Sequence, residues 1–287
     1  MGERSRPMRA SMLVVSALLL SACAPTGPGP AASPQETGIP TGAPAGIIAI
    51  GHSALTGENA DPGRQGEEAR DQSWATGDSP AVDSIYLRMV ENDPAHEGHV
   101  ANTASGGAVA SQLAAQAEAA LAEVSTPALV IIQTIDNDIR CDESDAANLP
   151  IFGEELASAL EVITEASPES KILIVSQRGR PAMLAEFLPA ATEEPAAGEE
   201  SCNFVTDEGE FVAANAAHLT AIIEAYEAEQ ARVCSETPNC FDDDGAMTTF
   251  ADTEQDLEGG DGNHLTTKGQ ARTAALIWPV VADILGY

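Results

Sequence analysis

Residues 128–134 read ALVIIQT, a short apolar run that follows Pro127 and ends in polar side chains. A run of this length, rich in β-branched residues, indicates a strand that is buried on both faces. Residues 47–50 (IIAI) and 171–175 (KILIV) repeat the pattern, and residues 99–103 predict a further short strand. Because helical segments separate these strands, we predict a mostly parallel sheet covered on both faces, a three-layer α/β fold. The helices are predicted at 81–90, 108–123, 154–165, 213–233 and 267–285.

The length and charge of the chain restrict its function. Its 287 residues suffice for one large domain, which we place at residues 46–287, and the sequence has no internal repeat. The chain carries 45 acidic and 13 basic residues, a formal charge of −32. This field repels phosphate backbones, so nucleic acid is not expected as a partner. We interpret the acidity as the solvated surface of an exported protein, with adaptation to an acidic or high-salt habitat as the alternative.

Residues 1–22 have the organisation of an export signal. Three basic residues, Arg4, Arg6 and Arg9, precede an apolar run at 12–20 that is too short for a permanent membrane-spanning helix. The run leads into Leu20-Ser21-Ala22-Cys23, which resembles the lipobox of bacterial lipoproteins. This resemblance implies that the thiol of Cys23 receives a diacylglycerol before the signal is cleaved.

Residues 23–45 are rich in Pro, Gly, Ala and Ser, and predict a flexible tether between the lipid and the domain. We therefore expect the protein at the extracellular face of a bacterial membrane. Its only expected contact with the membrane is the N-terminal lipid anchor. An ordinary cleaved signal peptide with an incidental Cys23 is the alternative.

Four cysteines remain besides Cys23, namely Cys141, Cys202, Cys234 and Cys240. An even number of cysteines in an exported protein predicts two disulfides. Three pairings are possible. We favour Cys234 with Cys240, because the intervening Ser-Glu-Thr-Pro-Asn can form a tight turn. Cys141 then pairs with Cys202. A structural zinc site is the competing interpretation, but the sequence contains no CxxC spacing.

Two segments at opposite ends of the domain carry candidate catalytic side chains. Ser53 directly follows the strand at 47–50, where a glycine-flanked turn can expose its hydroxyl above the sheet. Near the C-terminus, Asp261 precedes His264 by three residues. This spacing lets the carboxylate accept from one ring nitrogen while the other nitrogen faces a hydroxyl, which makes the imidazole a general base.

Two further loops contain candidate donors for a negatively charged oxygen. Gly106 lies in a glycine pair that leads into a helix, so its backbone N–H is not obstructed by a Cβ. Asn137 follows the strand at 128–134 and offers a side-chain N–H. Both groups could stabilise a developing oxyanion.

The order of these four segments resembles the SGNH, or GDSL, hydrolase family, over about residues 47–287. The resemblance implies Ser53 as nucleophile, His264 as base and Asp261 as its orienting carboxylate. It implies an oxyanion hole formed by Gly106, Asn137 and the backbone N–H of Ser53. It also implies a flavodoxin-like three-layer fold, no metal or other cofactor, and ester hydrolysis through an acyl-enzyme.

The sequence departs from the family pattern at three positions. His52 and Ala54 replace the Asp and Leu that flank the serine in the family, and Ile135 replaces a Gly. None of these changes removes a predicted catalytic atom. We expect His52 to pack or to form a hydrogen bond rather than to compete with His264 for the serine proton.

The strongly negative charge of the protein would repel anionic substrates. Neutral acyl esters or acetylated glycans are therefore more plausible substrates than anionic esters.

The main alternative function is a catalytically silent surface module that binds a glycan or a protein. An α/β-hydrolase is a second alternative, but Leu55 occupies the second glycine of its Gly-x-Ser-x-Gly elbow. A calcium site in the acidic segments 242–244 and 256–261 lacks the ligand order of an EF-hand. His96 and His99 lack the spacing of a metalloprotease motif.

Overall fold

The structure is a computed structural model that describes residues 43–184, 201–206, 208–258 and 263–287. The signal segment at 1–22, Cys23 and most of the predicted tether lie outside the described residues, as does Asp261. Among the described residues, no helix is both long enough and apolar enough to cross a membrane.

Five parallel strands form one sheet with the order β2-β1-β3-β4-β5. This order is that of the flavodoxin-like doubly wound folds. The fold class predicted from the sequence is therefore confirmed. The strands are β1 (Ile47–Gly51), β2 (Val100–Asn102), β3 (Leu129–Gln133), β4 (Lys171–Ile174) and β5 (Cys240–Asp242).

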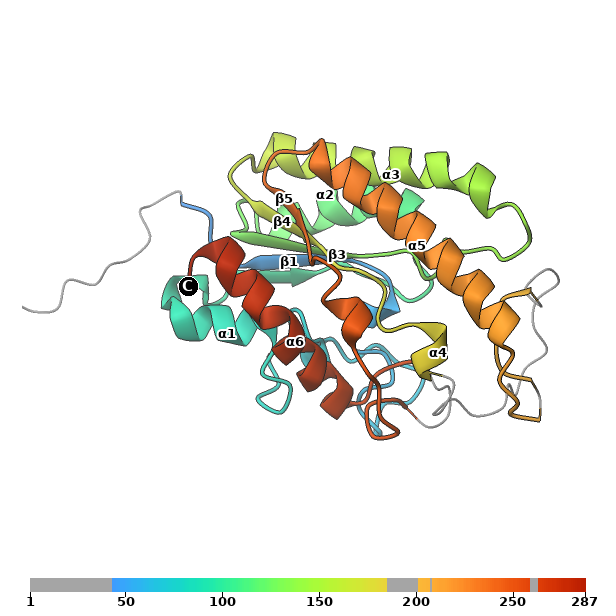
Figure 1. Ribbon diagram of the computed structural model, residues 1–287. Helices are drawn as coiled ribbons and strands as arrows, with labels where there is room; N and C mark the ends of the chain where they lie inside the picture. The colour runs from blue at the N-terminus through green and yellow to red at the C-terminus, as the bar shows by residue number, and fades with distance from the viewer. Residues whose placement is uncertain (1–42, 185–200, 207, 259–262) are drawn as a thin grey trace, which may run out of the picture. The chain divides into compact units, whose positions relative to one another are not determined.

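Helices cover both faces of the sheet, which gives the three layers visible in Figure 1. On one face lie α2 (Leu113–Glu123), α3 (Asp145–Ala166) and α5 (Ala213–Ser235). On the other face lie α1 (Ile85–Asn92) and α6 (Thr267–Leu285). The short α4 (Pro181–Leu184) follows β4.

Each central strand supplies side chains to both layers, because successive residues of a strand point to opposite faces. Ile48 and Ile50 of β1 belong to the core under α2, α3 and α5. Ile47 and Ala49 belong to the core under α1 and α6. Every residue of β1 and β3 is buried, which explains why these strands read as continuous apolar runs.

Three helices begin at a different residue from the one that the sequence predicts. The helix predicted at 81–90 begins at Ile85, because Ser84 caps it by accepting from the N–H of Leu87 at 3.2 Å. The helix predicted at 154–165 begins much earlier, at Asp145, whose carboxylate accepts the N–H groups of the preceding loop. At 108–123 the first turn is a 3-10 turn, and the α-helix begins at Leu113.

The structure forms both predicted disulfides. Cys141 pairs with Cys202, and Cys234 at the end of α5 pairs with Cys240 at the start of β5. The Cα atoms lie 5.8 Å apart in the first pair and 5.3 Å apart in the second. The zinc interpretation of these four residues is therefore wrong, because no thiolate is left among them.

Candidate active site

The end of β1 requires a glycine. Gly51 has a φ of +140°, and a Cβ at this position would lie 1.8 Å from the carbonyl oxygen of Gln133. Gln116 of α2 holds both sides of this residue: its Oε1 accepts the N–H of Gly51 at 2.7 Å, and its Nε2 donates to the carbonyl oxygen at 3.1 Å. These contacts fix the direction in which the chain leaves the sheet.

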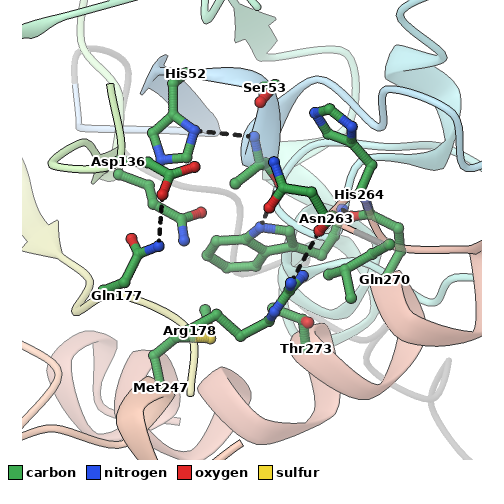
Figure 2. Close-up of a pocket in the computed structure, with 14 residues that line it drawn as sticks. His52, Ser53, Asp136, Gln177, Arg178, Met247, Asn263, His264, Gln270 and Thr273 are labelled. Carbon is green, nitrogen blue, oxygen red and sulfur yellow. Dashed lines mark hydrogen bonds between the residues drawn. The ribbon is translucent and has the colours of Figure 1, made fainter. Parts of the chain in front are cut away.

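Ser53 begins the 3-10 turn that follows, η1 (Ser53–Leu55). His52 caps this turn, and its Nδ1 accepts the N–H of Ala54 at 3.3 Å. Thr56 donates from its Oγ1 to the carbonyl oxygen of Ser53 at 2.9 Å. Ser53 thus lies directly beyond the carboxyl end of a central strand, on the wall of a pocket (Figure 2).

His264 lines the same pocket as Ser53, although the two residues come from opposite ends of the domain. It lies just before α6, where Thr266 caps the helix by accepting the N–H of Gly269 at 3.2 Å. In the view of Figure 2, Ser53 lies between His52 and His264. The role predicted for Asp261 stays a prediction, because that residue lies outside the described residues.

Glu58 places a carboxylate beside the imidazole of His264. Its Oε2 lies 3.6 Å from Nε2 of His264. The same Oε2 would lie only 2.9 Å from a Cβ added at Gly106. The loop after Ser53 therefore places a carboxylate near both His264 and the glycine predicted to bind the oxyanion.

Two of the three predicted oxyanion donors, Gly106 and Asn137, make other hydrogen bonds. The N–H of Gly106 donates to Oε1 of Glu68 at 3.0 Å. The side chain of Asn137 donates to the carbonyl oxygen of Ala108 at 3.1 Å and lines a separate hollow beside α3. Neither residue is among the described residues that line the pocket of Ser53, so their oxyanion roles stay predictions.

His52 is a hydrogen-bonding residue in a buried position, 2% exposed. Burial lowers the pKa of His52, and the nearby carboxylate of Asp136 offsets this only in part. The ring is therefore neutral, and because Nδ1 accepts from Ala54 the proton resides on Nε2. An imidazole in this state donates from Nε2 and cannot accept the serine proton there.

The pocket also contains polar residues that the sequence analysis did not select. They follow two central strands: Gln133 and Asp136 at the end of β3, and Gln177 and Arg178 after β4. Their position beyond the strand ends was the available signal, because ligands of doubly wound folds bind at this edge.

Trp74 joins the loop after Ser53 to the pocket. Its ring lines the pocket, and its Nε1 donates to the carbonyl oxygen of Ala54 at 3.1 Å. Its backbone N–H donates to Oε1 of Gln270 on α6 at 2.9 Å. Trp74 therefore both lines the pocket and anchors the loop that follows Ser53.

Of the two acidic segments, 242–244 lies within the described residues and 256–261 lies there only in part. Within the described ranges, no group of three or more His, Cys, Asp or Glu side chains is arranged to hold a metal ion. The carboxylate of Asp243 instead accepts from Ser176 Oγ at 2.5 Å and from the N–H of Met247 at 2.9 Å. These contacts hold the loop after β5.

No protein-family model matches the sequence, and no curated protein matches it either. Solved structures do match. An extracellular lipase from Streptomyces rimosus is 15% identical, with a TM-score of 0.47, and the match covers 84% of this chain and 99% of the lipase. The chain is similar to lipases and esterases of known structure.

Two further structures show the range of these similar proteins. A phospholipase A1 from Streptomyces albidoflavus is 12% identical, with a TM-score of 0.49. A carbohydrate acetylesterase from Sinorhizobium meliloti is 16% identical, with a TM-score of 0.46. Each match covers 84% of this chain and 99% of the other chain.

Proposed function

We propose that this protein is a serine esterase of the SGNH type that hydrolyses neutral carboxylic esters. The observation that carries the proposal is the pocket that Ser53 and His264 share at the carboxyl ends of the central strands. A hydroxyl that follows a buried strand and an imidazole from a distant loop are the two groups that nucleophilic acyl transfer needs.

The proposed reaction has two steps. The Oγ of Ser53 attacks the ester carbonyl while the imidazole of His264 takes the serine proton, and the imidazolium then passes this proton to the departing alcohol. Water attacks the acyl-enzyme with His264 again as base, which releases the acid and restores Ser53. The negative oxygen of each tetrahedral intermediate is assigned to the backbone N–H groups of Ser53 and Gly106 and to Asn137.

For Gly106 and Asn137 this assignment requires movement. Glu68 must release the N–H of Gly106, and the side chain of Asn137 must turn from Ala108. Catalytic hydrogen bonds often form only when substrate is bound, so the contacts without substrate do not decide these two roles.

The experiment measures hydrolysis of p-nitrophenyl acetate and labelling by a fluorophosphonate probe. We expect Ser53→Ala to abolish labelling and to lower kcat by about a thousandfold or more. The control is Ser235→Ala, an exposed serine at the end of α5, which should match the wild type. Equal rates in wild type and Ser53→Ala, with both folded, would favour the silent binding module.

We propose further that Cys23 carries a lipid that holds the domain outside a bacterial membrane. The two disulfides support an exported protein, because disulfides persist mainly outside the reducing cytosol. Expression of the full chain in bacteria fed an alkyne fatty acid should label the wild type but not Cys23→Ala. Equal labelling of both proteins would contradict the anchor.

A further inference from the structure

The pocket lies at the point of the sheet where the direction of winding reverses. In the order β2-β1-β3-β4-β5, the chain moves from β1 to β2 on one side and to β3 on the other. The crevice beyond the ends of β1 and β3 is where doubly wound folds bind ligands. His52 follows β1 and Gln133 ends β3, so these two residues flank that crevice.

Three residues that line this pocket each have one buried polar atom without a hydrogen-bond partner. In the described part of the chain, these atoms are Nε2 of His52, Oε1 of Gln133 and Oε1 of Gln177. His52 is 2% exposed and Gln133 is 3% exposed. Buried polar atoms are rarely left unpaired, so three of them from residues that line one pocket with Ser53 call for a ligand.

The hydrogen bonds that these residues already make determine what the three atoms offer. Nδ1 of His52 accepts from Ala54, so Nε2 is a donor. The Nε2 of Gln177 donates to Oδ1 of Asp136 at 2.9 Å, so its Oε1 remains as an acceptor. Oε1 of Gln133 is a second acceptor. Figure 2 shows His52, Asp136 and Gln177 on one side of the pocket and His264 on the other.

We infer that His52, Gln133 and Gln177 form a subsite that binds the hydroxyl groups of a polyhydroxylated alcohol, such as a partly acylated sugar, in the ester substrate. The inference rests on the proposed esterase function and narrows its substrate class. Trp74, Met247 and Leu265 also line the pocket, and we assign their apolar side chains to the C–H groups of the same ring.

Chemistry excludes the other common ligand groups from this subsite. An alkyl chain would leave the donor and both acceptors unpaired. A carboxylate cannot donate to the two glutamine oxygens and would face the carboxylate of Asp136. An ammonium group cannot accept from Nε2 of His52. A hydroxyl both donates and accepts, so two or more neighbouring hydroxyls can satisfy all three atoms.

The test compares a monoacetylated methyl glycoside, which keeps its other hydroxyls, with p-nitrophenyl acetate. The measured quantity is the ratio of the two kcat/KM values. Gln177→Met and Gln133→Met keep the side-chain length but remove the acceptor. We expect each variant to lower the ratio by about tenfold or more, because a buried hydroxyl then loses its partner.

Gln230→Met is the matched control. Gln230 is also a buried glutamine with an unpartnered amide atom, but it lies on α5 and lines a different hollow. Its substitution should leave the ratio at the wild-type value. Urea unfolding of all three variants shows whether each is folded under the assay conditions.

A direct binding measurement separates this inference from the esterase proposal. Calorimetry with Ser53→Ala and the monoacetylated glycoside should detect binding that Gln177→Met weakens. If no ester is hydrolysed but Gln177→Met still weakens binding of the glycoside, the subsite is supported and the esterase proposal fails. If esters are hydrolysed but neither glutamine variant changes the ratio or the binding, the three atoms bind only water and the inference is overturned.

Discussion

The guanidinium of Arg178 holds the residue that precedes His264. Its Nη2 donates a hydrogen bond of 2.9 Å to the carbonyl oxygen of Asn263. Its Nε lies 3.4 Å from Oδ2 of Asp252, whose side chain is completely buried. Because Arg178 follows β4, this contact fixes the loop of His264 to the sheet that also positions Ser53.

Arg178→Met should therefore reduce both stability and turnover. It leaves the buried carboxylate of Asp252 without its ionic partner, which costs about 3–5 kcal/mol in the free energy of unfolding. It also releases the loop of His264, so we expect kcat to fall about tenfold or more with a small change in KM. Urea unfolding and p-nitrophenyl acetate hydrolysis measure the two effects.

Adding Asp252→Asn to Arg178→Met separates stability from positioning. Burial raises the pKa of Asp252, so a neutral side chain at this position should recover much of the lost stability. The double variant should still turn over slowly, because the bond to Asn263 is absent. Recovery of kcat together with stability would show that Arg178 has only a structural role.

Gly51→Ala should destabilise the domain by about 3 kcal/mol or more, because its Cβ would overlap the backbone of β3. Gly66→Ala is the matched control: Gly66 also has a positive φ, +76°, but a Cβ there meets nothing within 4 Å. That substitution should cost only about 1–2 kcal/mol. Equal losses in urea unfolding would mean that the contact with Gln133 is not the cause.

Ile135 holds a backbone conformation that suits glycine, with a φ of +99° and a fully buried side chain. For a non-glycine residue this region costs about 1–2 kcal/mol. We therefore expect Ile135→Gly to be more stable than Ile135→Ala, by about 1 kcal/mol. At the neighbouring Ile132 in β3 the order should be reversed. Urea unfolding of the four variants tests this, and the same order at both positions would contradict it.

Ile135 also shows how far the sequence predicts the site. The resemblance marks this position as one where a glycine is usual, and Ile135 has a positive φ, which suits glycine, although its side chain belongs to the core. The strands were predictable for a related reason: β1 and β3 are buried on both faces, so burial alone determines their residues. The edge strand β5 was not predicted, because Phe241 and Asp242 are exposed there.

The contacts of the pocket were less predictable because they depend on side chains from distant loops. Strand-end position suggested Ser53, but nothing in the sequence showed that His52 would cap the turn through Nδ1. Likewise, Asn137 has the expected position after β3, yet its amide donates to Ala108. Local pattern gives the position of a residue, and packing between loops decides which atom faces the pocket.

The two disulfides should contribute unequally to stability. Cys141 and Cys202 are 61 positions apart, whereas Cys234 and Cys240 are 6 apart. In the chain-entropy model, these loops correspond to about 4 and about 2 kcal/mol of stabilisation. The double variant Cys141→Ser/Cys202→Ser should therefore unfold at lower urea than Cys234→Ser/Cys240→Ser. The opposite order would show that local packing around the shorter loop outweighs chain entropy.

The stability of the protein should depend on pH through His96. This residue is buried and is not among the residues that line the pocket. Its Nδ1 accepts the N–H of Gly46 at 2.8 Å, and Nε2 lies 2.6 Å from the hydroxyl of Tyr287. Burial lowers the pKa of His96, and the carboxylate of Asp93 offsets this only in part. The folded protein therefore resists protonation at a pH where the unfolded chain, with a histidine pKa of about 6.5, binds a proton.

The sign of the pH effect follows from this difference. The contribution of His96 is fully present above about pH 6.5 and is lost as the pH falls further, with a slope of up to about 1.4 kcal/mol per pH unit. His96→Gln should lower stability at pH 8, since it changes the contacts with Gly46 and Tyr287, but its unfolding free energy should fall less steeply toward pH 5. The slope should not vanish, because burial also lowers the pKa of His52. A difference between variant and wild type that stays constant from pH 8 to pH 5 would show that His96 does not carry this dependence.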